Sequence, residues 1–206
     1  MSLIYPSYFP NIANYIVFHH SRKICFEVQD NYQKQTFRNR CYIYGANGLM
    51  GLHIPVHYTQ KKRQKTSDII IDNSSPWKVN HWKSLESAYR TSPFFEFYED
   101  DLRPLFENKD DILLPFLYKC MNTINLCIDL DLCYIESNTF EKNHPEDFRF
   151  LINARSKNEI KTTPYIQVFQ NKFGYLNNLS ILDLLFNIGP DTLRYLEAHP
   201  PIEPTI

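Results

Sequence analysis

The start of the chain alternates between short apolar runs and one stretch with helical spacing. One apolar run covers residues 3–5 and a second covers residues 24–28, and each predicts a short strand. Between them, Ile12, Tyr15 and Ile16 repeat at the spacing of one helix face, which predicts a helix from residue 10 to about residue 21. This order predicts a βαβ unit at the start of the fold.

Two further apolar runs face each other across a turn bounded by glycines. Residues 41–44 and 49–56 flank the sequence Gly45-Ala46-Asn47-Gly48, which predicts a β-hairpin. A basic loop at residues 61–65 follows, and residues 69–71 then form an apolar run that predicts a buried strand.

The middle of the chain has the spacing of helices. Ser75 is a good N-cap and Pro76 a good first helical residue, and an apolar stripe then predicts a helix that ends near Pro93. Residues 94–106 and about 112–130 predict two more helices, followed by a strand at residues 133–135.

The last third begins as a polar segment and regains order near its end. Residues 136–163 predict a long loop, and residues 165–169 an extended segment. Ser180 and Asp183 fit the S-x-x-D form of a capping box, which predicts a helix that ends at Gly189. A last short helix is expected after it.

These elements predict an α/β fold in which helices cover a mixed sheet, with a Rossmann-like arrangement as one form of it. The hairpin keeps an α+β arrangement open as the alternative. We expect one domain over residues 1–206: a mostly sheet-forming part (1–75), a helical part (76–132), and a loop with C-terminal helices (133–206).

Composition narrows the class of protein. The 206 residues carry 22 basic and 23 acidic side chains, a formal net charge of -1, which argues against a polybasic nucleic-acid binder and an acidic disordered chain. No apolar run approaches the roughly 20 residues that span a bilayer, and the N-terminus lacks the pattern of a secretory signal. We therefore expect a cytoplasmic protein with no membrane span and no nucleic-acid partner.

The cysteines and histidines do not predict a metal centre or a disulfide framework. The number of cysteines is odd and no C-x-x-C pair occurs; they are Cys25, Cys41, Cys120, Cys127 and Cys133. His53 and His57 would lie about 13 Å apart on one strand, too far for a shared zinc ion. We expect free thiols, and no motif implies a cofactor.

Two basic groups are candidates for holding an anion. Lys61 and Lys62 open a loop with four cations in five residues, which suits a phosphate, a nucleotide sugar or a phospholipid headgroup; a solvated connection is the alternative. Arg38 and Arg40 would share one face of a strand end and could clamp a carboxylate or phosphate, whereas structural salt bridges are the alternative.

A histidine and an aspartate are candidates for proton transfer. His81 lies beside Trp82 on a predicted helix and can titrate near neutrality as an acid or base, unless it is a hydrogen-bonded core residue. Asp183 and Asn187 are four apart on one helix face, where capping of the Ser180 turn is the alternative to substrate binding.

Several segments together resemble one protein family over nearly the whole chain. The segments are Tyr5-Pro6-Ser7-Tyr8-Phe9-Pro10, Phe37-Arg38-Asn39-Arg40, Ile71-Asp72-Asn73, Trp77, His81-Trp82, residues 87–95, and residues 179–190. They resemble the WbqC-like family in its compact, Bacteroidetes-type form. Two features depart from the family pattern: Tyr5 replaces the leading Gln, and the segment between about residues 133 and 165 is short.

The resemblance implies a transferase in the biosynthesis of surface polysaccharide such as O-antigen, with transfer of glycine or another amino-acyl group to an amino sugar. Its site would use His81 and Asp183 as catalytic residues. The substrate would be a small molecule that bears phosphate, a nucleotide sugar or an activated acyl donor. The residues expected to bind it are Tyr8, Arg38, Asn39, Arg40, Lys61, Lys62, Asp72, Tyr89, Arg90 and Asn187.

Two other functions stay open. The 14 tyrosines and 15 phenylalanines could serve a partner surface, which would suit a non-catalytic binding or assembly protein. The N-terminal strand, proline and helix also resemble the position where nucleotidyltransferase-like enzymes carry phosphate-binding histidines, although those histidines are absent here.

Overall fold

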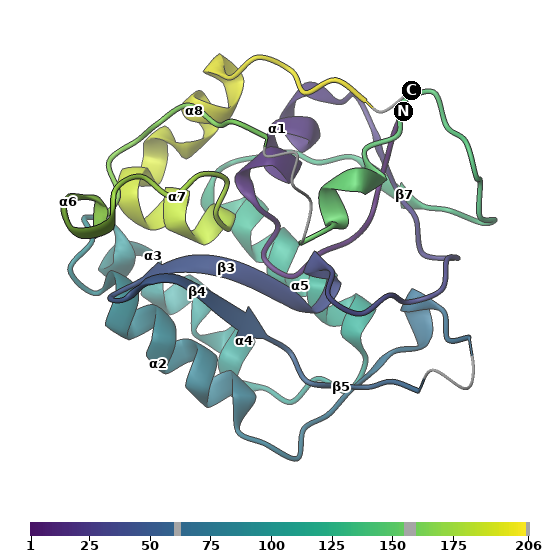
Figure 1. Ribbon diagram of the computed structural model, residues 1–206, viewed down its shortest axis with the longest axis horizontal. Helices are drawn as coiled ribbons and strands as arrows, with labels where there is room; N and C mark the ends of the chain where they lie inside the picture. The colour runs from purple at the N-terminus through teal and green to yellow at the C-terminus, as the bar shows by residue number, and fades with distance from the viewer. Residues whose placement is uncertain (60–62, 155–159, 205–206) are drawn as a thin grey trace.

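A three-stranded parallel sheet lies at one end of the fold. The structure is a computed structural model that describes residues 1–59, 63–154 and 160–204. The sheet has the order β1 (Ser2–Ile4), β2 (Ile24–Phe26) and β7 (Tyr134–Glu136), and all neighbours are parallel. Helix α1 (Ile12–His20) connects β1 to β2, which confirms the predicted βαβ unit (Figure 1).

The other strands form antiparallel pairs. Strands β3 (Arg40–Gly45) and β4 (Gly48–His53) form the predicted hairpin, and β5 (Val56–His57) pairs with β6 (Ile70–Ile71). Gly48 has a φ of 98°, a conformation that glycine adopts at little cost. The α/β class is therefore confirmed, with parallel and antiparallel pairs distributed over three small sheets in the described part of the chain.

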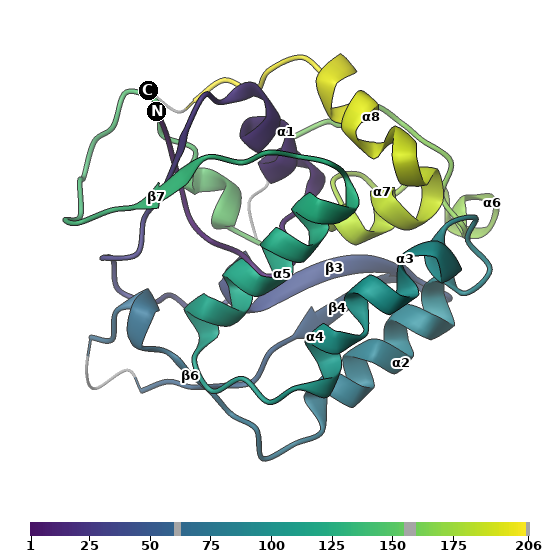
Figure 2. The same cartoon turned by 180° about the vertical axis from the view of Figure 1, so that it is seen from behind.

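Four helices follow in the middle of the chain: α2 (Trp77–Tyr89), α3 (Phe95–Leu102), α4 (Pro104–Glu107) and α5 (Leu113–Cys127). Strand β3 packs on α2 and on α7 (Ile181–Ile188), and Figure 1 shows the hairpin running between these helices. Helix α5 crosses behind the hairpin, as the reverse view in Figure 2 shows. The predicted N-cap, Ser75, is wrong by one residue, because Pro76 has a non-helical ψ of 49° and itself occupies the cap position.

The C-terminal part contains α6 (Gln170–Phe173), α7 and α8 (Thr192–Ala198). The Ser180 hydroxyl accepts a hydrogen bond from the Leu182 amide at 3.3 Å, so α7 begins where predicted. The expected extended segment at residues 165–169 forms no strand, and its last residues turn into α6. The long segment after β7 is pinned to β1 by backbone hydrogen bonds of Leu3 with Glu146 and Phe148, at 2.9 and 2.8 Å.

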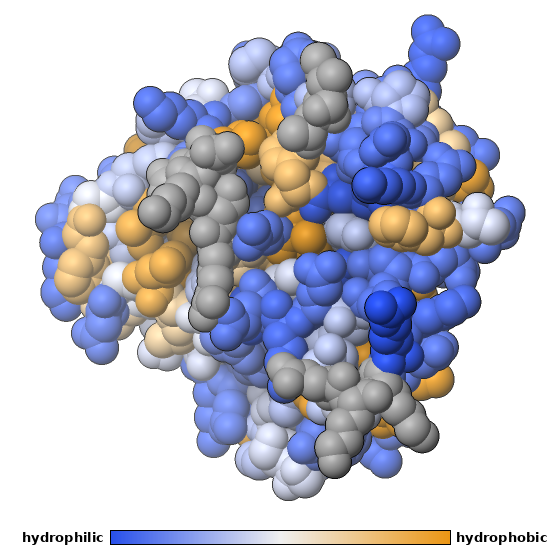
Figure 3. Space-filling model, turned by 45° about the vertical axis from the view of Figure 1, so that its right-hand side comes forward, coloured by the Kyte–Doolittle hydropathy of each residue, from blue (hydrophilic) through white to orange (hydrophobic). Residues whose placement is uncertain are grey.

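A continuous apolar core extends from Ile4 near the start of the chain to Leu196 in α8. The face that Figure 3 shows is mostly hydrophilic, with several separate apolar patches. Within residues 1–59, 63–154 and 160–204, no helix combines the length and apolar character needed to cross a bilayer.

Candidate functional site

A hollow of about 350 Å³ opens beside the start of the hairpin. We call it the Arg40 pocket. Three segments line it: residues 32–35, the residues at the start of β3, and the chain from the end of β4 to β5. Its lining residues are Tyr32, Lys34, Gln35, Asn39, Arg40, His53, Ile54, Pro55, Val56 and Tyr58.

The charge of the Arg40 pocket is positive. Among the lining residues that the structure describes, Lys34 and Arg40 are cations and none carries a carboxylate. Partial burial and the nearby charge of Arg40 lower the pKa of His53, so its imidazole is neutral at neutral pH. The pocket therefore favours an anionic ligand.

Two buried polar atoms at the pocket have no hydrogen-bond partner among the described residues. They are Nε of Arg40, a donor, and Oδ1 of Asn39, an acceptor. The amide nitrogen of Asn39 donates to the Ile54 carbonyl at 2.8 Å, which fixes the orientation of this side chain. Because buried polar groups are nearly always hydrogen-bonded, an open donor and an open acceptor on consecutive residues point to a ligand or ordered water as the partner of each.

Two tyrosines form an aromatic wall. The rings of Tyr32 and Tyr58 have centroids 5.3 Å apart, and Nζ of Lys34 lies 5.0 Å from the Tyr58 ring centroid. Burial raises the pKa of Tyr32 to about 12, so its hydroxyl stays protonated and can donate a hydrogen bond. Aromatic faces beside cations suit a ligand with both a charged group and a flat or apolar part.

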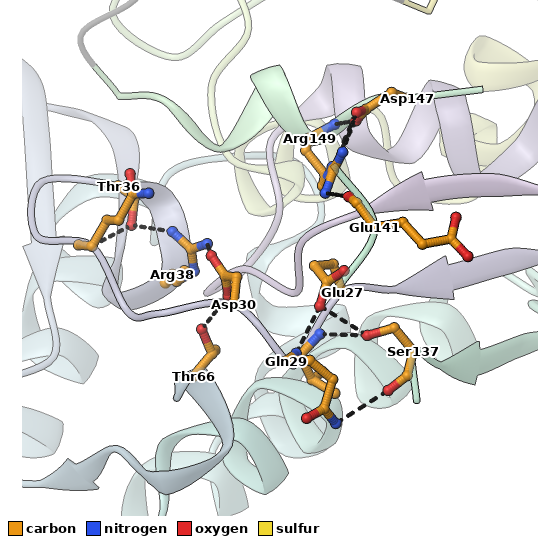
Figure 4. Close-up of polar contacts among 12 residues, drawn as sticks. Glu27, Gln29, Asp30, Thr36, Arg38, Thr66, Ser137, Glu141, Asp147 and Arg149 are labelled. Atoms are coloured by element: carbon orange, nitrogen blue, oxygen red, sulfur yellow. Dashed lines mark hydrogen bonds and ion pairs between the residues drawn. The ribbon is translucent and has the colours of Figure 1, made fainter. Parts of the chain in front are cut away.

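Arg38 does not line this pocket, and the prediction that it shares a face with Arg40 is wrong. Residues Phe37–Asn39 form a 3-10 turn, which breaks the alternation of a strand and directs Arg38 inward. Its guanidinium, 0% exposed, lies 2.5 Å from Oδ2 of Asp30 and 4.0 Å above the Tyr5 ring. Asp30 also accepts a hydrogen bond from Thr66 at 2.9 Å (Figure 4). Arg38 thus anchors the chain that carries the pocket residues.

His81 is buried and is not among the residues that line the pocket. Its Nδ1 forms a hydrogen bond with the Tyr8 hydroxyl at 3.0 Å, and the ring also forms a hydrogen bond with the backbone of His53. The Trp77 ring packs edge-on at 5.1 Å. Burial lowers the pKa of His81 to about 4, so the predicted titration near neutrality is wrong.

Asp183 belongs to a different buried cluster. Its carboxylate, 0% exposed, accepts hydrogen bonds from the hydroxyls of Tyr89 (2.6 Å) and Tyr165 (2.5 Å) and from the Gln167 amide (3.2 Å). Burial raises its pKa to about 6. The capping-box interpretation of this side chain is therefore wrong, because tertiary partners use both oxygens. His81 and Tyr89 are eight residues apart on α2, about 12 Å, so His81 and Asp183 do not share a site.

The remaining candidates lie elsewhere. Asn187 donates to the Asp183 carbonyl at 2.7 Å, and Arg90 forms an exposed ion pair with Glu86 at 2.9 Å. Asp72 accepts from the Ser74 amide at 2.9 Å. The predicted Lys61 and Lys62 fall outside the described residues. Of the predicted binding residues, the structure places Asn39 and Arg40 together at the pocket.

The pocket also contains residues that the sequence did not single out. Tyr32 and Lys34 come from the short polar segment Tyr32-Gln33-Lys34-Gln35, in which one aromatic and one basic residue are two apart, the one local signal that could have indicated them. Tyr58 reaches Tyr32 only through the tertiary fold. The cysteines are free thiols, and the described residues contain no group of three or more histidine, cysteine or acidic side chains suited to a metal ion.

Comparisons with known proteins connect this chain to relatives without an assigned activity. The family model described as the WbqC-like protein family matches residues 5–161. The "Uncharacterized protein Rv1507c" of Mycobacterium tuberculosis (strain ATCC 25618 / H37Rv) is 25% identical over 195 residues, which cover 80% of this chain and 84% of the relative. No solved structure matches the chain. Because the family model spans most of the chain, from the residue after β1 to beyond the Arg40 pocket, the protein belongs to the WbqC-like family.

Proposed function

We propose that this protein is a transferase whose Arg40 pocket holds a phosphate-bearing activated donor. The observation that carries the proposal is Nε of Arg40, which has no partner in the described part of the chain and belongs to a pocket whose described lining holds two cations and no carboxylate. A guanidinium presents its N–H groups in a planar fork that matches two oxygens of a phosphate. Lys34 adds a second positive charge at the same opening.

The other lining residues suit the remainder of such a donor. Oδ1 of Asn39 can accept a hydrogen bond from a ligand hydroxyl or N–H, and the rings of Tyr32 and Tyr58 offer surface to a sugar or base. These features fit an activated acyl donor, and they equally fit a nucleotide sugar bound as the acceptor.

The family membership supports a role in the biosynthesis of surface polysaccharide, with amino-acyl or glycine transfer to an amino sugar as the reaction. In that reaction the amine nitrogen attacks the acyl carbonyl carbon and an amide bond forms. The bond from the acyl carbon to the activating group breaks, this group leaves with the electron pair, and the amine loses a proton to solvent.

A thermal-shift experiment tests the donor site. The probes are uridine diphosphate N-acetylglucosamine, acetyl coenzyme A and inorganic pyrophosphate, with wild-type protein, Arg40→Met and Arg90→Met. A probe at ten times its Kd adds about 1.4 kcal/mol of stability, which raises the Tm of a chain of this size by about 3–6 °C. We expect at least one probe to raise the Tm of wild type and of Arg90→Met by the same amount. The same probe should raise the Tm of Arg40→Met by less than a third as much.

Arg90 is the matched control because it is an exposed arginine outside the pocket. Equal shifts in all three proteins would show that the anion binds elsewhere. If no probe raises the Tm of wild type, the result favours the alternative of a non-catalytic binding or assembly protein. A stoichiometric partner should then co-purify with the tagged protein.

A further inference from the structure

A second hollow, of about 210 Å³, lies on one face of the parallel sheet. Its apolar floor is formed by Leu3, Cys25 and Ile135, which are register partners on β1, β2 and β7 and therefore point to the same side. Glu141 and His144, from the segment after β7, line it as well. We call this hollow the Glu27 pocket.

Glu27 places a buried carboxylate at this pocket. It follows β2 directly and is 0% exposed, a rare position for a carboxylate. Its Oε1 accepts hydrogen bonds from the Gln29 amide at 2.7 Å and from the Ser137 hydroxyl at 2.9 Å (Figure 4). Its Oε2 is buried and has no hydrogen-bond partner among the described residues.

The neighbouring cation, Arg149, does not donate a hydrogen bond to Oε2 of Glu27. Arg149 uses its guanidinium on other acceptors: Nε and Nη2 bind Asp147 at 2.9 and 2.5 Å, and Nη1 binds the Glu141 carbonyl at 2.6 Å. Burial and the charges of Glu27 and Glu141 together raise the pKa of Cys25, as expected where two carboxylates lie near one thiol. Among the described lining residues, Glu27, Glu136 and Glu141 carry negative charge. The N-terminal ammonium of Met1 pairs with Glu146 at 2.8 Å. The pocket thus combines a mainly negative wall with an apolar floor.

We propose that the Glu27 pocket binds a primary ammonium group on a short aliphatic carrier. The ammonium would donate to Oε2 of Glu27, and its carbon chain would lie on Leu3, Cys25 and Ile135. This charge-assisted hydrogen bond would give Oε2 of Glu27 a partner, and a buried carboxylate oxygen without a partner is destabilising. The inference does not rest on the donor site, because the two pockets share no lining residue.

Ligand-observed saturation-transfer NMR at neutral pH tests the proposal with ethanolamine as the probe and ethylene glycol as its neutral counterpart. We expect saturable ethanolamine binding to wild type, with a Kd in the millimolar range, and no saturable binding of ethylene glycol. Glu27→Gln keeps the shape and removes the charge, so it should weaken ethanolamine binding roughly tenfold or more. Glu197→Gln, on the exposed side of α8, should bind as wild type does.

Two results would overturn the proposal: no saturable ethanolamine binding to wild type, or equal binding by Glu27→Gln. If Glu27→Gln does not fold, as judged by circular dichroism, Cys25→Met takes its place. The longer thioether fills the floor and leaves Glu27 intact, so binding should be lost, and retained binding would equally contradict the site.

Discussion

The buried carboxylate of Asp183 should make the protein less stable as the pH rises through the weakly acidic range. Its pKa is raised from 3.8 to about 6 by burial, although two tyrosine hydroxyls and an amide bind it. An acid whose pKa is higher in the folded chain binds more protons when folded than when unfolded. Its stabilising contribution is therefore complete below about pH 4 and is lost as the pH rises through about 6.

The size of this effect follows from the two pKa values. The difference between about 6 and 3.8 is about 2.2 units, and each unit corresponds to about 1.36 kcal/mol, so the full change is about 3 kcal/mol. Between about pH 4.5 and about pH 7.5, where the protein can be compared in practice, the contribution of Asp183 should fall by about 2 kcal/mol.

Urea unfolding followed by tryptophan fluorescence measures this quantity for wild type and Asp183→Asn at a series of pH values. Asn keeps the shape and cannot ionise, so the stability difference between the two proteins should shrink by about 2 kcal/mol over that range. Asn187→Ala is the control, because it removes a hydrogen bond to the Asp183 backbone and leaves the carboxylate in place. If the difference in free energy of unfolding between wild type and Asp183→Asn stays constant within about 0.5 kcal/mol across this pH range, the reasoning is refuted.

Two further predictions concern stability at fixed pH. Arg38→Met leaves a buried carboxylate without its counter-charge and should cost about 3–5 kcal/mol in urea unfolding. Arg90→Met removes the ion pairs of an exposed arginine with Glu86 and Glu99 and should cost less than about 1 kcal/mol. Similar losses in both would contradict the structural role of Arg38. Gly189→Ala should lower the Tm more than Gly48→Ala: both glycines have positive φ, but a Cβ at Gly189 would lie 2.5 Å from the Phe94 ring, while one at Gly48 meets nothing within 4 Å. The added contact should cost at least about 1 kcal/mol beyond the backbone strain, and equal Tm changes would count against it.

Local signals in the sequence were sufficient for most elements. The hairpin was recognisable because Gly45 to Gly48 supply a tight turn between apolar runs, and α7 because Ser180 caps its first turn. The order of strands in the parallel sheet was not recognisable, since β7 joins β2 through pairing that no short motif encodes.

The side chains that failed as site predictions did so through tertiary partners. Asp183 fits a capping box by spacing, yet Tyr89, 94 residues away in sequence, takes one of its oxygens. The alternation argument for Arg38 assumed a strand, and a 3-10 turn placed it against Asp30 instead. Asn39 and Arg40 reach the pocket because they lie where the chain enters the hairpin, an element that the local pattern does predict.

The spacing of the parallel strands along the chain has a consequence for synthesis on the ribosome. Strands β1 and β2 pair across a short connection (Ser2 with Ile24), whereas β2 and β7 pair across a much longer one (Ile24 with Tyr134). Loop closure favours the nearer pairing, so the β1–α1–β2 unit can form while the rest of the chain is still being made. Ser137, which binds Glu27 from 110 residues further along, arrives with β7. Until then the Glu27 carboxylate faces water as an ordinary surface acid, and the Glu27 pocket comes into existence only when the last strand docks.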